Sequence, residues 1–388
     1  MRKVAIIGVG HSKFGNRQDV NVCEMAYEAI KPALDEAGLT PRDIPFVALG
    51  TVGIWYEEPL PVVAIAEFCG LTGAGLARLE AACATGSAAI YTAYSAIASG
   101  HLDLSLVIGV EKMREVDTPT AVELIGRSGS YLWEFENFGL TFPAYYALHA
   151  VAHMNKYGTT EEDLALVAVK NHKYGAMNPL AHFQREITLE EALSSHVIAW
   201  PLKLYDCCPI TDGAAAVVLA SEEKVKELGI DTPVWIEAIG HSSGTANLSK
   251  RGTYVGLEAS VKASRMAYKM AKIGPEQIDV ATVHDCFTIA EIMAYEDVGF
   301  CQKGEGPKLI REGQTEIGGK IPVNIDGGLK AKGHPIGATG VSMAVELTKQ
   351  LREEVEPKSR QAPMKNYIAM AHNVGGTGHY CYVTILKR

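Results

Sequence analysis

A glycine-rich stretch from Gly327 to Gly340 contains one histidine, His334, and precedes an amphipathic run from Val341 to Leu351. Glycine adopts backbone angles that other residues resist, so the stretch predicts a specially shaped loop in front of a helix. A histidine held there is a candidate proton carrier, because its unperturbed pKa of about 6.5 lies near neutrality. Loops of this kind also bind phosphate, which is the alternative interpretation. A base at His334 requires a nucleophile elsewhere in the chain.

Cys83 is the candidate nucleophile. It precedes an alanine- and serine-rich run, Ala84 to Ser99, that predicts a tightly packed, buried helix. The N–H groups and the dipole at a helix N-terminus stabilise a thiolate, and small neighbours leave room for a substrate. The alternative is that Cys83 is a small core residue, as most free cysteines are.

Two further loops follow predicted strands and carry polar side chains. His284, Asp285 and Cys286 form one of them, and Asn373 and Gly375 belong to the other, which is rich in glycine. Open α/β sheets place their chemistry where strands end. The glycines of the second loop favour backbone N–H groups that face an anion. We predict no metal site, because adjacent residues on an extended chain point apart and the sequence holds no CxxC pair.

Similar segments recur in the same order in the two halves of the chain. A helix, a turn with proline and an apolar strand occur around Pro41 and again around Pro275. The strand predicted at residues 4–8 resembles the one predicted at 234–240. An apolar run at 214–220 predicts a buried strand that completes the first sheet. We therefore predict a duplicated α/β unit.

The duplication relates Cys83 to the histidine loop. Ala-Thr-Gly opens a predicted helix at residues 84–86 and again at 338–340. When the repeats are aligned, Cys83 falls opposite Gly337, three residues after His334. In a duplicated fold the two helix starts meet at the centre, and His334 then reaches Cys83.

The boundaries of these units follow from changes in composition. We predict an N-terminal half from residues 1–117 and 200–230, and a C-terminal half from residues 231–388. Residues 118–199 are rich in aromatic residues and histidine and predict an inserted loop domain. Within this insertion, residues 161–174 predict a helix that is capped by threonine.

The composition is that of a soluble globular protein with a large core. The 388 residues are 47% hydrophobic and 21% charged, and the net charge is −9. This charge disfavours nucleic acid and anionic membranes as partners. No apolar run approaches the roughly 20 residues that span a bilayer. Residues 4–10 predict a buried strand rather than a signal peptide, so we expect a cytoplasmic protein with reduced cysteines.

These loops resemble those of the thiolase family over the whole chain. The stretch from Gly333 to Gly340 resembles the family's histidine loop, and the stretch from Ala82 to Gly86 resembles its nucleophile loop. The stretch from Asp212 to Ala216 resembles a strand-entry motif. The resemblance implies an α/β fold with five layers, αβαβα, built from an internal duplication and carrying an inserted loop domain.

Two departures from the common thiolase pattern indicate a subgroup. His284-Asp285-Cys286-Phe287 replaces the usual Asn-Glu-Ala-Phe, and Asn373-Val374-Gly375 replaces the usual Cys-x-Gly. This pattern is similar to that of sterol-carrier-protein-2-type thiolases and archaeal acetoacetyl-CoA thiolases. We expect no sterol-carrier domain after Arg388, which favours the archaeal type.

The resemblance implies an acetyl-CoA C-acetyltransferase that condenses two acetyl-CoA molecules to acetoacetyl-CoA and CoA, feeding the mevalonate pathway. It implies Cys83 as nucleophile, His334 as its base, Cys286 as the base for the second substrate and His284 as a donor to the enolate. Asn373 and Gly375 would support the oxyanion site, the donors being the N–H groups of Cys83 and Gly375. CoA enters as a substrate, and no permanently bound cofactor is expected.

Other functions and partners are compatible with the sequence. The alternatives are a degradative 3-oxoacyl-CoA thiolase for longer chains and a non-catalytic thiolase-like binder of acyl-CoA or lipid. Lys250 and Arg251 are candidates for binding the nucleotide phosphates of CoA. The resemblance also implies a homo-oligomer, a dimer or a tetramer, and a complex with hydroxymethylglutaryl-CoA synthase through a small scaffold protein.

Overall fold

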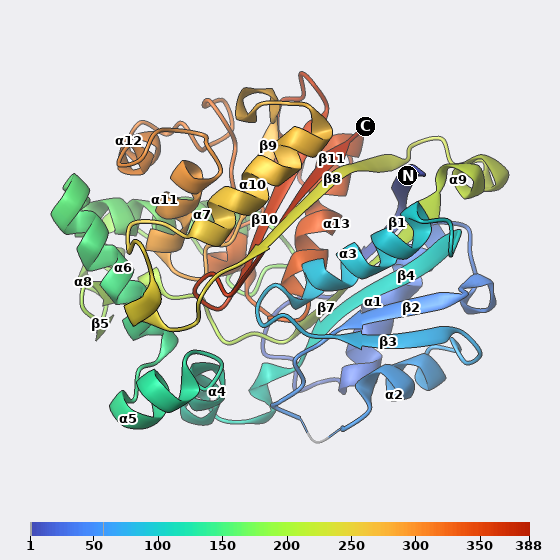
Figure 1. The fold of residues 1–388 in the computed structure, drawn as a ribbon, viewed down its shortest axis with the longest axis horizontal. Coiled ribbons are helices and arrows are strands. Elements are labelled where there is room, and N and C mark those ends of the chain that lie inside the picture. Colours follow the sequence, from blue (N-terminus) through green and yellow to red (C-terminus); the bar gives the residue numbers. More distant parts are fainter. Residues whose placement is uncertain (1, 57) are drawn as a thin grey trace.

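The structure is a computed structural model that describes residues 2–56 and 58–388. In this part of the chain nine strands form one mixed sheet in the order β3-β2-β4-β7-β1-β8-β11-β10-β9 (Figure 1). The strands of this sheet are β1 (Val4–His11), β2 (Phe46–Gly50), β3 (Gly75–Leu79), β4 (Leu104–Glu111), β7 (Gly213–Ser221), β8 (Val234–Ser243), β9 (Val280–Val283), β10 (Ile368–Gly375) and β11 (Tyr380–Lys387). Most of these strands are apolar and buried along nearly their whole length, as strands covered on both faces are.

The strand order contains the same arrangement twice. In the first half β2 pairs with β4 in parallel, and β4, β7 and β1 follow in antiparallel pairs. In the second half β9, β10, β11 and β8 repeat this pattern of directions. The two halves join where β1 pairs with β8 through Ala5 with Trp235 and Ile6 with Val234. The duplicated α/β unit expected from the sequence is therefore present.

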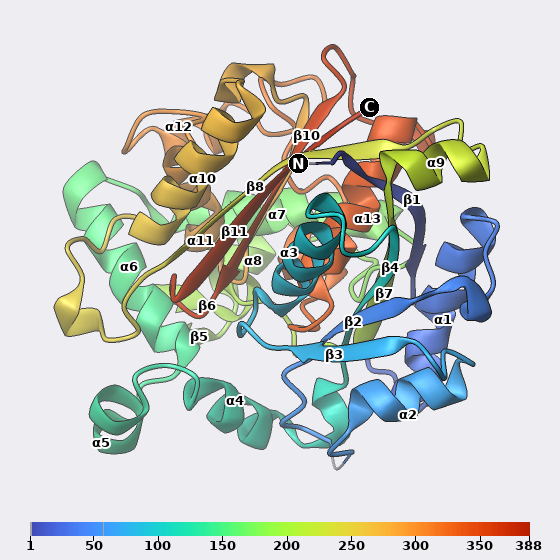
Figure 2. The ribbon, with the colours of Figure 1, turned by 45° about the vertical axis from the view of Figure 1, so that its right-hand side comes forward.

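Helices divide the fold into five layers (Figures 1 and 2). One outer layer contains α1 (Val22–Glu36), which packs on β1 and β7, and the other contains α10 (Glu258–Ala271), which packs on β8 and β11. The central layer is formed by α3 (Thr85–Ala98) and α13 (Thr339–Arg352), which contact each other, and α13 contacts strands of both halves. The remaining helices of the two halves are α2 (Pro61–Phe68), α9 (Glu222–Leu228), α11 (Thr288–Asp297) and α12 (Gly306–Arg311). This is the αβαβα arrangement implied by the resemblance.

The N-termini of the two central helices approach each other closely because small residues stand at the contact. A Cβ atom added to Gly86 would lie 2.8 Å from the backbone N of Val341 and 2.9 Å from the carbonyl O of Gly337. A Cβ atom added to Gly340 would lie 2.4 Å from the backbone N of Ser87. The chain segments just before these helices are thereby brought together, as the repeat alignment predicted.

The segment between β4 and β7 is mostly helical and lies beside the layered core (Figure 1). It contains α4 (Thr118–Gly126), α5 (Glu136–Phe138), α6 (Phe142–Tyr157), α7 (Glu161–Met177) and α8 (Leu189–Ser194), with the short hairpin of β5 (Val197–Ala199) and β6 (Leu202–Lys203). The helix predicted at 161–174 runs three residues further, and the Thr160 side chain caps it by accepting from the Asp163 N–H. The domain boundaries at 118–199 stay a prediction.

The helices of the described chain are each too short or too polar to cross a lipid bilayer.

The close contact of the central helices generates the first prediction. Gly86→Ala should lower the free energy of unfolding by about 1–3 kcal/mol, because the added methyl group meets backbone atoms that cannot turn away. Urea unfolding measures the change. Gly15→Ala is the matched control, since a Cβ atom there has no neighbour within 4 Å. Equal stability of the two variants would contradict the proposed packing constraint.

Candidate active site

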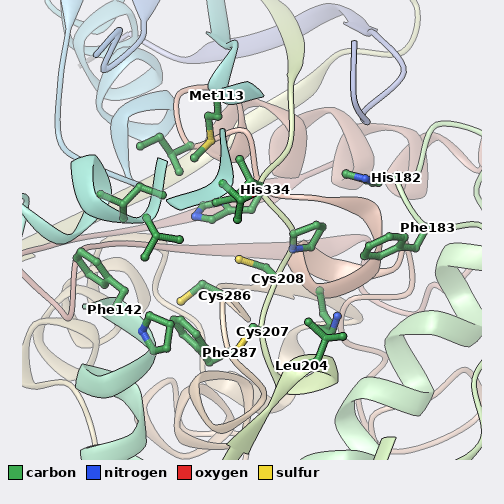
Figure 3. A pocket seen from close by; sticks show the side chains of 18 of the residues that line it. Met113, Phe142, His182, Phe183, Leu204, Cys207, Cys208, Cys286, Phe287 and His334 are labelled. Carbon is green, nitrogen blue, oxygen red and sulfur yellow. The ribbon is translucent and has the colours of Figure 1, made fainter. Parts of the chain in front are cut away.

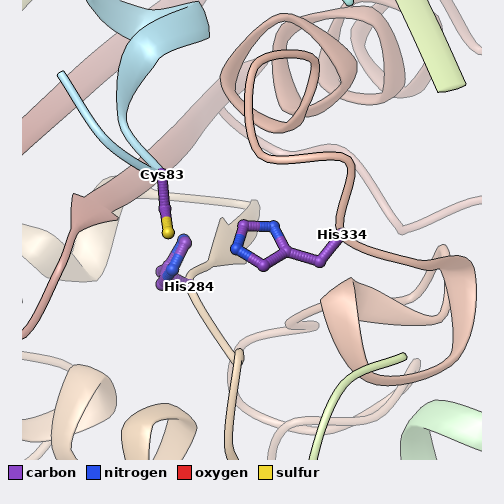
Figure 4. A group of neighbouring side chains, drawn as sticks. All are labelled: Cys83, His284 and His334. Carbon is purple, nitrogen blue, oxygen red and sulfur yellow. The ribbon is translucent and has the colours of Figure 1, made fainter. Parts of the chain in front are cut away.

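Three buried side chains from distant parts of the chain meet at the centre of the molecule (Figure 4). One ligand atom from each of Cys83, His284 and His334 lies within 4.8 Å of the other two. Cys83 precedes α3, His284 follows β9, and His334 precedes α13. All three are at most 9% exposed. The structure therefore brings together a thiol and two imidazoles that the sequence had singled out.

His334 is held in the tautomer that suits a base. The Thr339 hydroxyl donates to the Pro335 carbonyl over 3.0 Å, so its oxygen accepts a hydrogen from His334 Nδ1 at 2.7 Å. The network assigns the proton of the ring to Nδ1 and leaves Nε2 as the free acceptor. Nε2 is buried and has no protein partner in the described chain. Burial lowers the pKa of His334 to about 3, so the ring is neutral at rest.

His284 has the opposite tautomer, fixed by Asn373. The Asn373 amide oxygen accepts from the Ser87 hydroxyl at 2.8 Å, and its Nδ2 donates to the Cys83 carbonyl over 3.0 Å. The same Nδ2 lies 3.2 Å from His284 Nδ1, which must therefore accept. The ring proton of His284 is then on Nε2, where it is available as a donor inside the site. Burial and the neighbouring ring of His334 lower the pKa of His284 far below its ordinary value.

Cys83 is a neutral thiol at rest. Burial raises its pKa to about 12, although the backbone N–H groups of Gly376 and Cys83 itself oppose this shift. The sequence suggested a thiolate stabilised by the start of the next helix, but the residue lies two positions before α3 and is buried, so desolvation outweighs that effect. The thiolate can form only as its proton leaves for a nearby base.

The backbone donor beside the sulfur lies one residue later than expected. Gly375, the predicted donor, ends β10, and a Cβ atom there would lie 2.4 Å from the Ala81 carbonyl oxygen. Gly375 thus permits the close approach of β10 to the nucleophile loop. The N–H group that faces the Cys83 sulfur belongs to Gly376.

Cys286 lines the same cavity as Cys83 and is 6% exposed. Its carbonyl accepts from the Cys208 N–H over 3.0 Å, which joins this loop to the segment before β7. Burial raises the pKa of the Cys286 thiol, the nearby Cys208 and Cys83 raise it further, and the Tyr146 hydroxyl opposes the shift. The Cys286 thiol is therefore neutral at rest.

Two buried carboxylates fix the loops that carry these groups. Asp285 accepts from the N–H groups of Leu329 at 2.7 Å and Lys330 at 3.1 Å, and so ties the turn before His334 to the strand end that carries His284 and Cys286. Burial and the nearby Glu291 raise the pKa of Asp285.

Glu111, at the end of β4, is the second carboxylate and holds the C-terminal end of the histidine loop. It accepts from the N–H groups of Val52 at 2.9 Å, Gly53 at 2.8 Å and Gly337 at 3.1 Å. The end of the histidine loop is thereby anchored to the first half of the sheet. Burial raises the pKa of Glu111 to about 7 despite these donors.

The site opens into a cavity of about 800 Å³ (Figure 3). Near Cys83 its wall is apolar and includes Met113, Ile125 and Ile336. Elsewhere it is lined by the cations Arg114, Arg185 and Lys330 together with Cys207, Cys208, His182 and Phe183. None of the described residues that line the cavity is an aspartate or a glutamate. The cavity suits a long, partly apolar ligand that carries negative charge.

The basic pair proposed for CoA binding lies elsewhere. Lys250 and Arg251 line a separate, smaller hollow and are not among the described residues of the cavity that contains Cys83. Arg251 donates to the Thr245 carbonyl over 3.1 Å and to the Thr377 hydroxyl. It therefore supports the loop after Gly376, and the role of Lys250 and Arg251 in binding CoA stays a prediction.

The side chains of Cys83, His284 and His334 also have the donor types of a zinc site. A thiolate and two imidazoles are common zinc ligands, and the sequence argument against a metal did not consider residues so far apart. A metal there would occupy the Cys83 sulfur and His334 Nε2, between which a proton would pass in nucleophilic catalysis. Metal binding and that chemistry are therefore mutually exclusive.

Several residues of the site were not predicted from the sequence. Four of them, Ser87, Glu111, Gly376 and Tyr146, act through hydrogen bonds to groups far away in the chain. The fifth, Thr339, accepts from His334, five residues before it. The sequence indicates Thr339 only as part of the Ala-Thr-Gly motif that opens a helix. Its hydroxyl five residues after a candidate base was the one local signal that could have identified it.

Family comparisons agree with this geometry. Residues 4–223 match the N-terminal domain of thiolases, and residues 240–388 match the family described as thiolase C-terminal domain-like.

The chain is similar to proteins named acetyl-CoA acetyltransferase from two archaea. It is 43% identical to that of Methanothermobacter thermautotrophicus, with all of both chains covered, and 40% identical to that of Methanocaldococcus jannaschii, with 100% of this chain and 99% of the relative covered. Among solved structures, the Ltp2–ChsH2(DUF35) aldolase is similar with a TM-score of 0.84 and 26% identity, covering 99% of this chain and 97% of the other.

The burial of Cys83 generates a prediction of its pH dependence. Its alkylation by iodoacetamide should accelerate about tenfold per pH unit between about pH 7 and pH 10, because the thiolate fraction grows in this way below a raised pKa. Mass spectrometry of the peptide that contains Cys83 measures the rate. A plateau below about pH 8 would instead indicate a stable ion pair with His334.

Proposed function

Because the chain belongs to the thiolase family, we propose that it is an acetyl-CoA C-acetyltransferase, which joins two acetyl-CoA molecules to give acetoacetyl-CoA and CoA. The same site would catalyse the reverse thiolysis. The observation that carries the proposal is the meeting of Cys83 with His284 and His334, beside a cavity that Cys83, His334 and Cys286 line. The names of the two archaeal relatives support acetyl-CoA as the substrate.

The first half-reaction transfers the acetyl group to Cys83. The sulfur attacks the thioester carbonyl while its proton passes to His334 Nε2, the free acceptor of that ring. The CoA thiolate leaves and takes a proton from the Cys286 thiol. The products are acetyl-Cys83, free CoA, a protonated His334 and a Cys286 thiolate.

The second half-reaction forms the carbon–carbon bond. The Cys286 thiolate removes a proton from the methyl carbon of a second acetyl-CoA. The enolate oxygen accepts hydrogen bonds from Nε2 of His284 and of the protonated His334. The enolate carbon attacks the acetyl carbonyl, and the released Cys83 thiolate regains its proton from His334. Every group is thereby restored to its starting state.

Backbone donors would hold the negative charge that develops on the acetyl oxygen. The N–H groups of Gly376 and Cys83 both face the sulfur. They take the place predicted for the pair of Cys83 and Gly375. One such preorganised donor is worth about 2.7–4 kcal/mol in related chemistry.

The large cavity accommodates the CoA substrate. Its cations Arg114, Arg185 and Lys330 would balance the charge of the nucleotide, and its narrow apolar wall would face the pantetheine arm and the acyl group. CoA leaves after each turnover, so no permanent cofactor is required.

The cellular role follows from the same reaction. Acetoacetyl-CoA made in the cytoplasm would feed the mevalonate pathway, and hydroxymethylglutaryl-CoA synthase would consume it, with a small scaffold protein joining the two enzymes. An exposed apolar group, Tyr131, Leu132, Trp133 and Phe138, supports association through the inserted segment, either in a homo-oligomer or with such a partner.

Two alternative functions remain, a thiolase for substrates with longer acyl chains and a binder of acyl-CoA without catalytic activity. The apolar wall of Met113, Ile125 and Ile336 beside Cys83 favours a thiolase for longer 3-oxoacyl chains. A non-catalytic acyl-CoA binder would have no use for two histidines held in opposite tautomers beside a thiol.

The two half-reactions can be separated by changing one cysteine at a time. Cys286→Ser should still release one CoA per site from acetyl-CoA, because a thiolate leaves readily and solvent can protonate it in place of Cys286. It should form acetoacetyl-CoA at least about 100-fold more slowly, because the serine hydroxyl is a far weaker acid than a thiol and provides no anion to act as the base. Cys83→Ala should release no CoA. Rapid quenching with thiol titration measures both, with Cys301→Ser as the control. Normal condensation by Cys286→Ser would remove that residue from the mechanism.

A series of substrates with increasing acyl length distinguishes the acetoacetyl-CoA enzyme from the degradative thiolase. With acetoacetyl-CoA, 3-oxohexanoyl-CoA and 3-oxooctanoyl-CoA, kcat/KM for thiolysis should fall with each added pair of carbons if the enzyme serves acetoacetyl-CoA. A value that rises with length would favour the degradative thiolase instead.

A further inference from the structure

The hydroxyl of Tyr146 connects the two thiols of the site. Tyr146 lies on α6 in the inserted segment and is fully buried. Its hydroxyl donates to the Gly376 carbonyl over 3.1 Å and lies close enough to the Cys286 thiol to influence its pKa. Its ring stacks on Phe287, the neighbour of Cys286, with centroids 4.7 Å apart and planes at 27°. The hydroxyl therefore lies between Cys286 and the loop whose N–H faces Cys83.

A phenol has one hydrogen to donate, so its partner depends on the charge of Cys286. When Cys286 is a neutral thiol, the hydrogen points to the Gly376 carbonyl. When Cys286 is a thiolate, the sulfur becomes the stronger acceptor, because hydrogen bonds to charged groups are about twice as strong as neutral ones. The arrangement provides a donor to the thiolate without a residue of opposite charge.

The other groups around Cys286 disfavour its negative charge. Cys208 and Cys83 lie nearby, and the carboxylate of Asp285 adds its own charge. Lys330, which lines the same cavity, is directed toward the rings of Phe183 and Tyr205 at 5.6 and 5.7 Å. Among the groups that act on the thiol most strongly, the Tyr146 hydroxyl is the one that favours the thiolate.

We propose that Tyr146 is a positioning residue that stabilises the Cys286 thiolate and directs it to the methyl group of the second acetyl-CoA. The inference rests on the proposed function, in which Cys286 removes that proton. The inserted segment then takes part in the reaction, because Tyr146 lies on α6 and the other groups of the site lie on loops of the two halves. Burial raises the pKa of the Tyr146 hydroxyl, and the positive charge of the nearby Arg251 opposes this shift.

The test compares Tyr146→Phe with Tyr145→Phe. The first variant removes the hydroxyl beside Cys286. The second removes the hydroxyl of the preceding residue, which donates to Glu134 over 2.8 Å and does not line the cavity of the described chain. Both variants retain the ring and its packing. The measurements are the release of CoA in the first half-reaction and the rate of condensation between about pH 6 and pH 10.

Tyr146→Phe should keep the release of the first CoA within about twofold, because solvent can protonate the leaving CoA thiolate in place of Cys286. It should slow condensation by about 10–100-fold, because that step requires the Cys286 thiolate. The apparent pKa of condensation should rise by about one unit, since the thiolate loses its donor. Tyr145→Phe should change none of these quantities. A purely structural role would slow both half-reactions alike and leave the pH profile in place.

Two outcomes separate the inference from the function on which it rests. If wild-type protein condenses acetyl-CoA and Tyr146→Phe shows an unchanged rate and pH profile, the inference is wrong and the proposed function stands. If wild-type protein acetylates Cys83 without condensation, both are wrong.

A second measurement covers the case in which Tyr146→Phe does not fold. Site-specific 3-fluorotyrosine at position 146 keeps the ring and makes the phenol a stronger donor. It should shift the pH profile of condensation downward. An unchanged profile would overturn the inference.

Discussion

The close approach of two helix N-termini is the constraint on which the site depends. Glycines at positions 86 and 340 let α3 and α13 meet with backbone against backbone, where any side chain would collide. Cys83 and His334 precede these helices, whose starts are related by the internal duplication. Because each half of the chain supplies one of the two groups, neither half contains the chemistry alone. The buried carboxylates of Glu111 and Asp285 then hold the connecting loops to the ends of the strands.

Burial makes the resting site electrically neutral. The thiol pKa is raised and the imidazole pKa values are lowered, so proton transfer between Cys83 and His334 is unfavourable until a substrate carbonyl is present. The tautomers of the two histidines are nevertheless fixed in advance by Thr339 and Asn373. The charges that develop during the reaction therefore meet donors and acceptors already in place, and little reorganisation is needed.

Much of this architecture was predictable from the sequence. Buried strands such as β4 and β7 have distinctive apolar runs, and the repeated order of segments placed Cys83 opposite the loop of His334. The details that local sequence does not predict depend on contacts across the fold. The packing of β10 and the loop after it places Arg251 against Thr377 and the Gly376 N–H beside the Cys83 sulfur. Local spacing in the sequence does not determine either contact. The Tyr146 hydroxyl reaches a carbonyl 230 positions away in the chain, and no periodicity predicts such a pair.

The most direct test of the account is the location of the acetyl group in the enzyme during its first turnover. Wild-type protein is mixed with acetyl-CoA, quenched in acid within that turnover, digested and mapped by mass spectrometry. The account predicts one acetyl group on the peptide that contains Cys83, with free thiols at Cys286 and Cys208. An acetyl group found on Cys286 or Cys208 instead would contradict it.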